Sequence, residues 1–452
     1  MKNFKILVIG GTAAGTAAAA KAARINPGAE VILFEKSDTV SYGVCEIPFL
    51  IGGVIQDEKQ LVIYSPQKLS QEKKITVKTL HQLEKILPSK KKILIRDLNA
   101  GLLFEQKYDR LILATGASPK KLNIKGEECI NVLNIRSHSD TNALLNYLNS
   151  EKPKSVTIIG GGFVGIEMAE AFRRRNMEVT IIHNKELPLN DFDYEIQQMV
   201  LDELKKNQIN FVANAKTEAF IKSKSQRVEY VVTNKGTFET DLVIVAVGIV
   251  PNTEIFKSSR IRLGENNAIK VNNMQETNIE GVYAAGDCCE VKNIVTGKSA
   301  YIPLATVAVR SGWVAGENAA GGKAKFEGAI FSAAIKLFSL EIARAGLTED
   351  EAKSLRYNYV KDFITADTKV PFMPENKKIF IKLIVDKTTK RILGAQLAGE
   401  EGVALRANTI GTAIQMKLTV YEFSKMDLLY FPMFSPLWDP LLVAANSIKK
   451  KL

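Results

Sequence analysis

The residue best suited to chemistry in this sequence is Cys45, which stands in the segment SYGVCEIPF at residues 41–49. Gly43 and Pro48 indicate a loop around it. The apolar spacing of residues 47–51 allows a helix that begins at Cys45, and a helix N-terminus would favour the cysteine thiolate. Because thiolates attack disulfides, we expect Cys45 to be a redox nucleophile.

Several nearby and similar residues bear on this expectation. Glu46 places a carboxylate beside the sulfur, and like-charge repulsion should raise the pKa of the thiol. Most free cysteines are small buried apolar groups, and we interpret Cys129, Cys288 and Cys289 in that way because no pair has CxxC spacing. The three histidines are scattered along the chain, so we expect no metal site.

The composition is that of a globular protein with more than one domain. A chain of 452 residues predicts two to four domains, with 46% hydrophobic and 24% charged residues. We expect a cytoplasmic protein that does not enter a membrane, because no apolar run approaches about 18 residues and the N-terminal residues lack signal-peptide order. The net charge of +12 comes from dispersed lysines. It therefore favours phosphorylated small molecules over nucleic acid.

Residues 5–35 have the pattern of a strand, a glycine turn, a helix and a second strand. The turn reads GGTAAG at residues 10–15, an alanine-rich helix follows to about Arg24, and the second strand ends in Glu35. Glycines let a backbone approach a pyrophosphate, the helix N-terminus stabilises its charge, and Glu35 could accept hydrogen bonds from a ribose. The pattern predicts a dinucleotide site, although Thr12 stands where a second glycine is usual.

A second copy of this pattern spans residues 156–182 and has all three glycines, Gly160, Gly162 and Gly165. Its second strand ends in the sequence HNK at residues 183–185, with no acid to bind a ribose diol. Lys185 could meet a 2′-phosphate instead, which modestly favours NADPH; the alternative is that Lys185 is a surface residue and both nucleotides are used. Two nucleotide sites in one chain imply two nucleotides in one reaction.

Three further apolar strands end in turns. Residues 108–117 end in Ala-Thr-Gly, residues 241–252 contain Gly248 at the corresponding place, and residues 281–287 end in Asp287. Asp287 could hydrogen-bond the ribityl chain of a flavin or be a simple turn aspartate. From about residue 326 no glycine fingerprint appears. The chain closes with an aromatic and proline-rich stretch at residues 430–440, which we expect to pack against a partner subunit.

Together these motifs resemble the flavin-dependent pyridine nucleotide–disulfide oxidoreductases over essentially the whole chain. The resemblance implies an α/β protein with two Rossmann-like dinucleotide-binding domains, one for FAD and one for NAD(P), and a C-terminal α+β dimerisation domain that forms a homodimer. The implied boundaries are residues 1–115 and 246–325 for the FAD domain, 116–245 for the NAD(P) domain and 326–452 for the dimerisation domain.

The same resemblance assigns cofactor contacts to individual positions. Those implied for FAD are Gly10, Thr12, Ala14, Gly15, Glu35, Lys36, Ala114, Thr115, Gly116, Asp287 and Ala305. Those implied for NADPH or NADH are Gly160, Gly162, Val164, Gly165, Glu167, Lys185 and Gly248. Glu167 would assist placement of the nicotinamide, against the alternative of a surface acid on a helix.

Within this superfamily the sequence resembles the single-cysteine branch. The glutathione and lipoamide reductases carry a CxxxxC pair, whereas the positions five residues from Cys45 are Val40 and Leu50. NADH oxidases and peroxidases carry a histidine in the first glycine turn, and the matching position here is Ala13, which cannot transfer a proton. This difference weighs against oxygen or peroxide as the main substrate.

The coenzyme A-disulfide reductases look closest, because their cysteine loop and their C-terminal aromatic segment are similar to residues 41–49 and 430–439. The resemblance implies coenzyme A contacts at Lys21, Arg24, Ser41 and Lys73. Three positions depart from the family pattern, namely Glu46, Val44 and the position of Phe372 or Met373. Family members have a tyrosine at the third of these positions. Tyr430 would therefore be the only tyrosine hydroxyl left to act at the site.

We therefore expect an enzyme that uses FAD and NADPH or NADH to reduce coenzyme A disulfide, a coenzyme A persulfide or a polysulfide. Cys45 would form a mixed disulfide with coenzyme A, and Tyr430, from the other subunit, would stabilise or protonate the departing thiolate. The alternatives are an NADH oxidase and a flavin-based electron-transfer or redox-sensing protein, which would not need Cys45.

Overall fold

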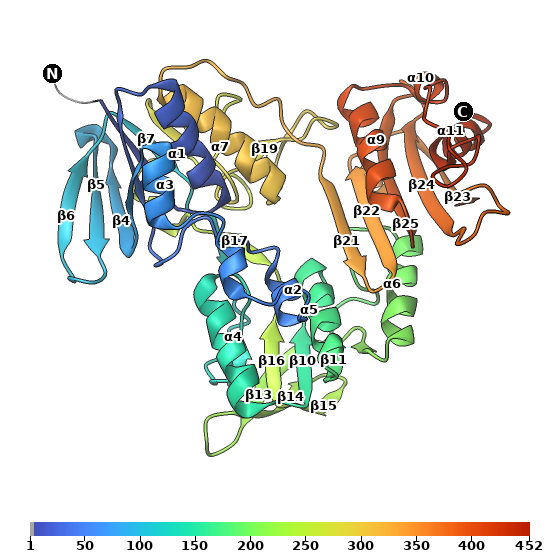
Figure 1. The fold of residues 1–452 in the computed structure, drawn as a ribbon, viewed down its shortest axis with the longest axis horizontal. Helices are drawn as coiled ribbons and strands as arrows, with labels where there is room; N and C mark the ends of the chain where they lie inside the picture. The colour runs from blue at the N-terminus through green and yellow to red at the C-terminus, as the bar shows by residue number, and fades with distance from the viewer. Residues whose placement is uncertain (1–3) are drawn as a thin grey trace.

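The computed structural model describes residues 4–452, so the first three residues of the expected FAD domain lie outside it. Three units are visible in Figure 1: a blue and yellow unit that contains both early and late segments, a green unit below it, and an orange to red C-terminal unit. The expected α/β class with two parallel-sheet nucleotide folds and a separate C-terminal domain is confirmed. The domain boundaries stay predictions.

The first unit is built on a parallel sheet of five strands in the order β18-β7-β1-β2-β3. Its apolar strands are buried on both faces, because helices cover one face and a small antiparallel sheet with neighbouring loops covers the other. Its strands are β1 (Lys5–Ile9), β2 (Glu30–Phe34), β3 (Thr76–Lys78), β7 (Arg110–Leu113) and β18 (Val282–Ala284), and its helices are α1 (Ala13–Ile25), α3 (Pro66–Lys73) and α7 (Ala305–Ala319). Helix α2 (Ile47–Ile51) comes from the same part of the chain but packs against the second unit (Figure 1).

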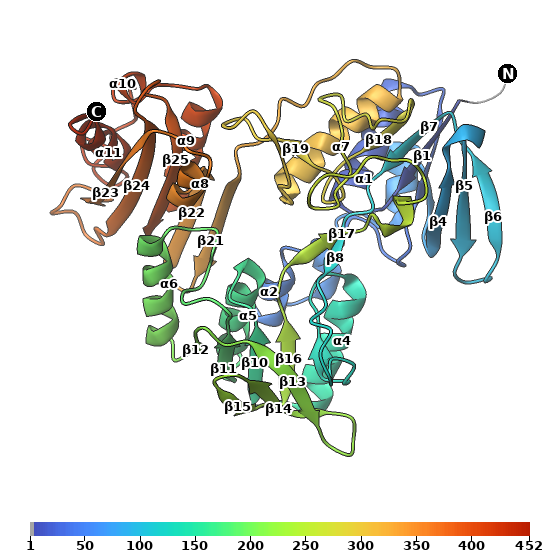
Figure 2. The same cartoon turned by 180° about the vertical axis from the view of Figure 1, so that it is seen from behind.

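Helices α1 and α7 pack side by side at unusually short range (Figure 2). A Cβ added at Gly312 would lie 2.4 Å from the carbonyl oxygen of Ala14, and one at Gly316 would lie 2.2 Å from that of Ala18. Only glycine allows this approach, so residues from the end of the first unit hold the first nucleotide helix in place.

Smaller sheets and turns complete the first unit. They are the antiparallel sheet β4 (His81–Leu87), β5 (Lys92–Asp97) and β6 (Leu103–Lys107), the pair β19 (Val291–Lys292) and β20 (Ser299–Ala300), and the short helices η1 (Glu58–Leu61), η2 (Pro88–Lys90) and η3 (Glu254–Phe256). The chain leaves and re-enters this unit through the antiparallel pair β8 (Ala117–Pro119) and β17 (Ile249–Pro251).

The second unit repeats the parallel design, with strand order β12-β11-β10-β16-β9. Its strands are β9 (Val132–Leu133), β10 (Ser155–Ile159), β11 (Glu178–Ile182), β12 (Asn210–Val212) and β16 (Leu242–Val245). Its helices are α4 (His138–Glu151), α5 (Phe163–Arg174) and α6 (Tyr194–Lys206). A three-stranded antiparallel sheet, β13 (Thr217–Lys222), β14 (Val228–Thr233) and β15 (Gly236–Glu239), is inserted before β16.

The C-terminal unit is an antiparallel sheet in the order β21-β22-β25-β24-β23, covered by helices. Its elements are β21 (Ser332–Leu337), β22 (Leu340–Gly346), α8 (Glu349–Ser354), β23 (Tyr359–Asp367), β24 (Lys378–Asp386), β25 (Ile392–Gly399), α9 (Val403–Gln415), α10 (Val420–Phe423) and α11 (Pro440–Lys449). Helix α6 of the second unit lies against its sheet in both views (Figures 1 and 2).

Candidate active site

The cysteine loop is tied to the first glycine turn by backbone hydrogen bonds. The N–H of Ser41 donates to the carbonyl oxygen of Gly11 over 2.7 Å, and the N–H of Gly43 donates to that of Leu61, also over 2.7 Å. The hydroxyl of Tyr42 donates to Thr141 of α4, in the second unit. The loop that carries Cys45 is therefore held between the two nucleotide-binding units.

The helix after Cys45 starts later than expected. Helix α2 begins at Ile47 and Glu46 is its N-cap, so the prediction that a helix begins at Cys45 is wrong. A helix from Cys45 would need the N–H of residue 48 to bond to the carbonyl oxygen of Val44, and Pro48 has no N–H. With five residues, α2 is also too short to favour a thiolate strongly.

The surroundings of Cys45 disfavour its thiolate. Although the residue is exposed, neighbouring protein removes part of the water that would solvate the sulfur, and this burial raises the pKa of Cys45. The carboxylates of Glu46 and Glu167 raise it further, whereas Arg136 lowers it. The expectation that the helix terminus favours the thiolate is therefore wrong, and the expected opposing effect of Glu46 is confirmed.

The carboxylate of Glu46 folds over Gly43, because a Cβ added at Gly43 would lie 2.5 Å from its Oε2 atom. We expect Glu46→Gln to lower the pKa of Cys45, since the change removes a negative charge and keeps the shape of the side chain. The rate of Cys45 alkylation as a function of pH in the reduced holoprotein checks this, with Cys45→Ser as the background. An unchanged titration midpoint would show that the carboxylate does not act on the sulfur.

Glu167, on α5 of the second nucleotide fold, lies near enough to Cys45 to raise the pKa of its thiol. Burial, with a smaller contribution from Glu170, raises the pKa of Glu167 to about 7. The carboxyl group therefore changes its protonation near neutral pH, at a place between the cysteine and the second glycine turn. This position agrees with the predicted role in nicotinamide placement, which stays a prediction.

The raised pKa of Glu167 predicts that this residue makes the stability of the protein depend on pH. A carboxyl group with a pKa near 4.5 when unfolded and about 7 when folded destabilises the protein increasingly as pH rises through that window. We expect Glu167→Gln to increase the melting temperature of the holoprotein at pH 8 and to have a smaller effect at pH 5. Glu178→Gln, at an exposed residue, should show no such pH dependence.

The ends of β1, β7 and β18 meet at one edge of the first sheet, because Ile9 pairs with Leu113 and Leu113 with Ala284. This register brings together Gly10, the Ala-Thr-Gly turn and Asp287, as a ligand site at the carboxyl ends of parallel strands requires. At Gly116, with φ of 66°, a Cβ would meet no atom within 4 Å, so open space adjoins the turn. The residues present thus fit a bound FAD.

Asp287 forms an ion pair that was not predicted. Its Oδ2 atom accepts a hydrogen bond of 2.5 Å from Arg136, which precedes α4. Arg136 is also the cation that lowers the pKa of Cys45. No local pattern singles this arginine out, because it lies 151 residues from its partner in the sequence.

Asn252 holds the Ala-Thr-Gly turn and was also missed. The side-chain amide of Asn252 donates to the backbone carbonyl oxygen of Thr115 over 2.8 Å. The backbone carbonyl oxygen of Asn252 accepts from the Thr115 hydroxyl over 2.9 Å. The clue in the sequence was the position of Asn252 just after a matching apolar strand and Gly248.

Among the other residues predicted to contact FAD, Lys36 and Ala305 are exposed and Ala114 is buried.

Both glycine turns have the close contacts that their sequences predict. In the first, a Cβ at Gly15 would lie 1.8 Å from the carbonyl oxygen of Gly10. In the second, the corresponding distance from Gly165 to Gly160 is 2.0 Å, while Gly162 faces open space. Thr12 is the N-cap of α1 and Val164 is an exposed residue of α5, and Ala14 is buried against α7.

The residues predicted to contact coenzyme A lie on the first unit. Lys21 forms an ion pair of 2.7 Å with Glu317, Arg24 is exposed near the end of α1, and Lys73 lies 5.3 Å from the centre of the Tyr64 ring. Helices α1 and α3, which carry these residues, contact each other. Their role stays a prediction.

Tyr430 lies in the C-terminal unit, and within residues 4–452 of one chain no hydrogen bond joins it to the cysteine loop. Its segment exposes several large apolar side chains, namely Leu429, Tyr430, Phe431, Phe434, Leu437 and Trp438. Such a surface is typical of an interface between subunits. The expected action of Tyr430 on Cys45 from a second subunit stays a prediction.

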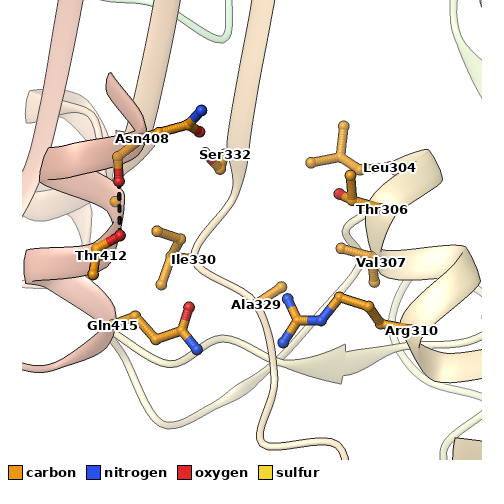
Figure 3. Close-up of a pocket in the computed structure, with 11 residues that line it drawn as sticks. Leu304, Thr306, Val307, Arg310, Ala329, Ile330, Ser332, Asn408, Thr412 and Gln415 are labelled. Carbon is orange, nitrogen blue, oxygen red and sulfur yellow. Dashed lines mark hydrogen bonds between the residues drawn. The ribbon is translucent and has the colours of Figure 1, made fainter. Parts of the chain in front are cut away.

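A separate cleft lies outside this site. It has a volume of about 250 Å³ and lies between α7 and α9, where Arg310 and Gln415 face each other across it (Figure 3). None of the predicted catalytic, cofactor or coenzyme A residues lines it. Within residues 4–452, no helix is long and apolar enough to span a membrane, and no cluster of ligating side chains is arranged to hold a metal.

Two parallel-sheet nucleotide folds, each with a glycine turn, and a separate C-terminal domain define the class of this protein, a flavoprotein oxidoreductase. The chain belongs to the pyridine nucleotide-disulphide oxidoreductase family, which residues 4–312 match, and residues 332–440 match the dimerisation domain of that family. The expected family and enzyme class are thereby confirmed.

Known relatives cover nearly the whole chain. The NAD(P)H sulfur oxidoreductase (CoA-dependent) of Pyrococcus furiosus is 36% identical over 99% of this chain and 100% of its own. An NADH oxidase of Methanocaldococcus jannaschii is 33% identical over 99% of both chains. A coenzyme A disulfide reductase of Staphylococcus aureus is 30% identical over 95% of this chain and 96% of its own.

Two solved structures are closely similar. Reduced CoADR-RHD of Bacillus anthracis has a TM-score of 0.96 and 31% identity, covering 100% of this chain and 81% of that one. An NAD-dependent persulfide reductase of A. fulgidus has a TM-score of 0.95 and 33% identity, covering 99% of this chain and 83% of that one.

Proposed function

We propose that this protein uses FAD and NAD(P)H to reduce coenzyme A disulfide or a coenzyme A persulfide or polysulfide at Cys45, as a homodimer. The observation that carries the proposal is the position of Cys45, on a loop bonded to the first glycine turn and beside Glu167 of the second nucleotide fold. Relatives named for coenzyme A-dependent sulfur and disulfide reduction support it.

In the proposed reaction, the Cys45 thiolate attacks one sulfur of coenzyme A disulfide. A Cys45–S–S–CoA bond forms, the original S–S bond breaks, and one coenzyme A thiolate leaves. FAD, when bound, would relay two electrons from NAD(P)H to the new bond, which returns the Cys45 thiolate and a second coenzyme A. With a persulfide, Cys45 would instead take the outer sulfur, release coenzyme A as a thiolate and become a persulfide itself. The two electrons from NAD(P)H would then break that S–S bond, release sulfide and return the Cys45 thiolate.

Because the surroundings of Cys45 raise the pKa of its thiol, the reaction depends on the fraction of Cys45 that is ionised. A thiol with a raised pKa is a strong nucleophile once it is ionised, and Arg136 is the nearby cation that opposes the carboxylates. Lys21, Arg24 and Lys73 would meet the phosphates of coenzyme A and Ser41 its chain, while Tyr430 of the partner subunit would protonate the leaving thiolate.

Intact-mass analysis of the purified, oxidised protein tests the proposal. A mass loss that matches coenzyme A after treatment with a thiol reductant, absent from Cys45→Ser, is the expected result. Anaerobic assays of coenzyme A disulfide against coenzyme A persulfide would then identify the preferred substrate. A free or sulfenic Cys45 with no adduct would contradict the coenzyme A assignment.

NADH oxidase activity is the second candidate, because relatives with that name match nearly the whole chain. Ala13 is the first residue of α1 and offers no proton donor beside the first glycine turn. We therefore expect oxygen consumption with NADH to be slow compared with reduction of the sulfur substrate. Oxygen uptake that is equally fast would favour the oxidase.

A further inference from the structure

The two nucleotide folds use the same backbone group in the same way, but with different partners. In the first fold, the N–H of Gly11 donates to the Oε2 atom of Glu35 over 2.6 Å. In the second, the N–H of Gly161 donates to the Nδ1 atom of His183 over 3.1 Å. His183 therefore occupies the position of the ribose-binding carboxylate, and it was not among the predicted site residues.

This hydrogen bond determines which nitrogen of His183 carries the proton. Because Nδ1 accepts from Gly161, it carries none, and the proton of the neutral ring resides on Nε2. The ring is buried, with its centre 5.9 Å from that of Phe211, and burial lowers the pKa of His183, with Lys185 contributing. At neutral pH, His183 is thus an uncharged hydrogen-bond donor through Nε2.

The groups around His183 add no buried negative charge. The Nε2–H group donates to the Oδ1 atom of Asn190 over 3.5 Å, a long hydrogen bond. The side chains of Asn190, Lys185 and Glu186 are all exposed on the loop that follows the strand. The space that a nucleotide would need is present, since a Cβ at Gly162 would meet nothing within 4 Å. A carboxylate at the position of His183 would repel a 2′-phosphate, whereas the Nε2–H group can donate to one.

We propose that His183 is a specificity-determining residue that lets this enzyme bind NADPH at least as tightly as NADH. The buried, neutral imidazole replaces the acid that selects NADH, and on nucleotide binding the 2′-phosphate takes the place of the exposed Asn190 side chain as the acceptor of the Nε2–H group. Lys185 supplies the nearby positive charge, partly offset by Glu186. This inference deepens the proposed function by naming the nucleotide, but it does not depend on the sulfur substrate.

The test is calorimetric binding of NADP⁺ and NAD⁺ to the FAD-loaded protein without any sulfur compound. The native protein should bind NADP⁺ at least as tightly as NAD⁺. His183→Asp should weaken NADP⁺ binding relative to NAD⁺ by about tenfold or more, because the two negative charges repel each other. The matched variant His183→Asn keeps a neutral acceptor for Gly161 and should change the ratio by less than about threefold.

Nitrogen NMR of histidine-labelled protein tests the ring itself. The chain has three histidines, so the signal missing from His183→Asn identifies this residue. We expect an unprotonated Nδ1 and a protonated Nε2 at pH 7.5. Flavin content and melting temperature establish that each variant is folded.

Three results would overturn the inference: native protein that binds NAD⁺ more than tenfold tighter than NADP⁺, a ratio unaffected by His183→Asp, or a doubly protonated ring at pH 7.5. None of these readouts involves coenzyme A. Failure of the nucleotide assignment and failure of the sulfur assignment are therefore separately visible.

Discussion

Turnover of coenzyme A disulfide should fall by at least about a thousandfold in Cys45→Ser, the scale on which loss of a catalytic nucleophile acts. The hydroxyl group keeps nearly the same size, but it cannot form the S–S bond on which the proposed reaction depends. Cys129, Cys288 and Cys289 cannot replace it, because all three are buried and Cys288 and Cys289 donate their S–H groups to backbone carbonyl oxygens. Steady-state oxidation of NADPH under anaerobic conditions measures the effect.

Electron transfer from NADPH to ferricyanide is the matched control for this variant. Neither nucleotide fold depends on the sulfur atom, so Cys45→Ser should keep most of this activity and its full flavin content. Retention of coenzyme A disulfide turnover by Cys45→Ser would contradict the proposal and favour an electron-transfer protein. Loss of the ferricyanide reaction as well would mean that the variant is misfolded.

The second large effect concerns Lys382, which is 1% exposed and joins the second unit to the C-terminal unit. Its Nζ atom lies 2.7 Å from Glu195, 2.7 Å from Glu349 and 3.2 Å from Asp193. We expect Lys382→Met to destabilise the protein by about 3–5 kcal/mol at pH 7, because the change leaves buried carboxylates without their cation. Denaturant unfolding of the holoprotein measures it.

Lys361→Met is the control, since Lys361 contacts the same Glu349 at 2.6 Å but is 47% exposed. That change should cost less than about 1 kcal/mol. Burial already raises the pKa of Asp193, and loss of Lys382 should raise it further. The folded variant would then take up protons as pH falls, so the cost of Lys382→Met should shrink toward pH 5. Equal costs for both lysines would show that burial does not matter here.

The sequence by itself determined the parts of this protein that depend on local spacing. The glycine patterns at residues 10–15 and 160–165 predicted both nucleotide folds. Glycine is required where one backbone segment contacts another too closely for a Cβ atom, as at Gly15 and Gly165. Alternation and apolar runs predicted the sheets, and the motif around Cys45 predicts a reactive thiol, which stays a prediction. These signals are short in range, so one sequence is enough to see them.

Only the tertiary structure decided what surrounds these groups. Pro48 moved the start of α2 past Cys45, and folding placed Glu167 and Arg136 around a sulfur from which they are distant in sequence. Folding also brought the ring of His183 within hydrogen-bond distance of the Gly161 N–H group. That single backbone hydrogen bond determines the tautomer of the ring. Electrostatic interactions and hydrogen bonds depend on distances in the folded protein. The spacing of residues along the chain does not show which distant groups come into contact.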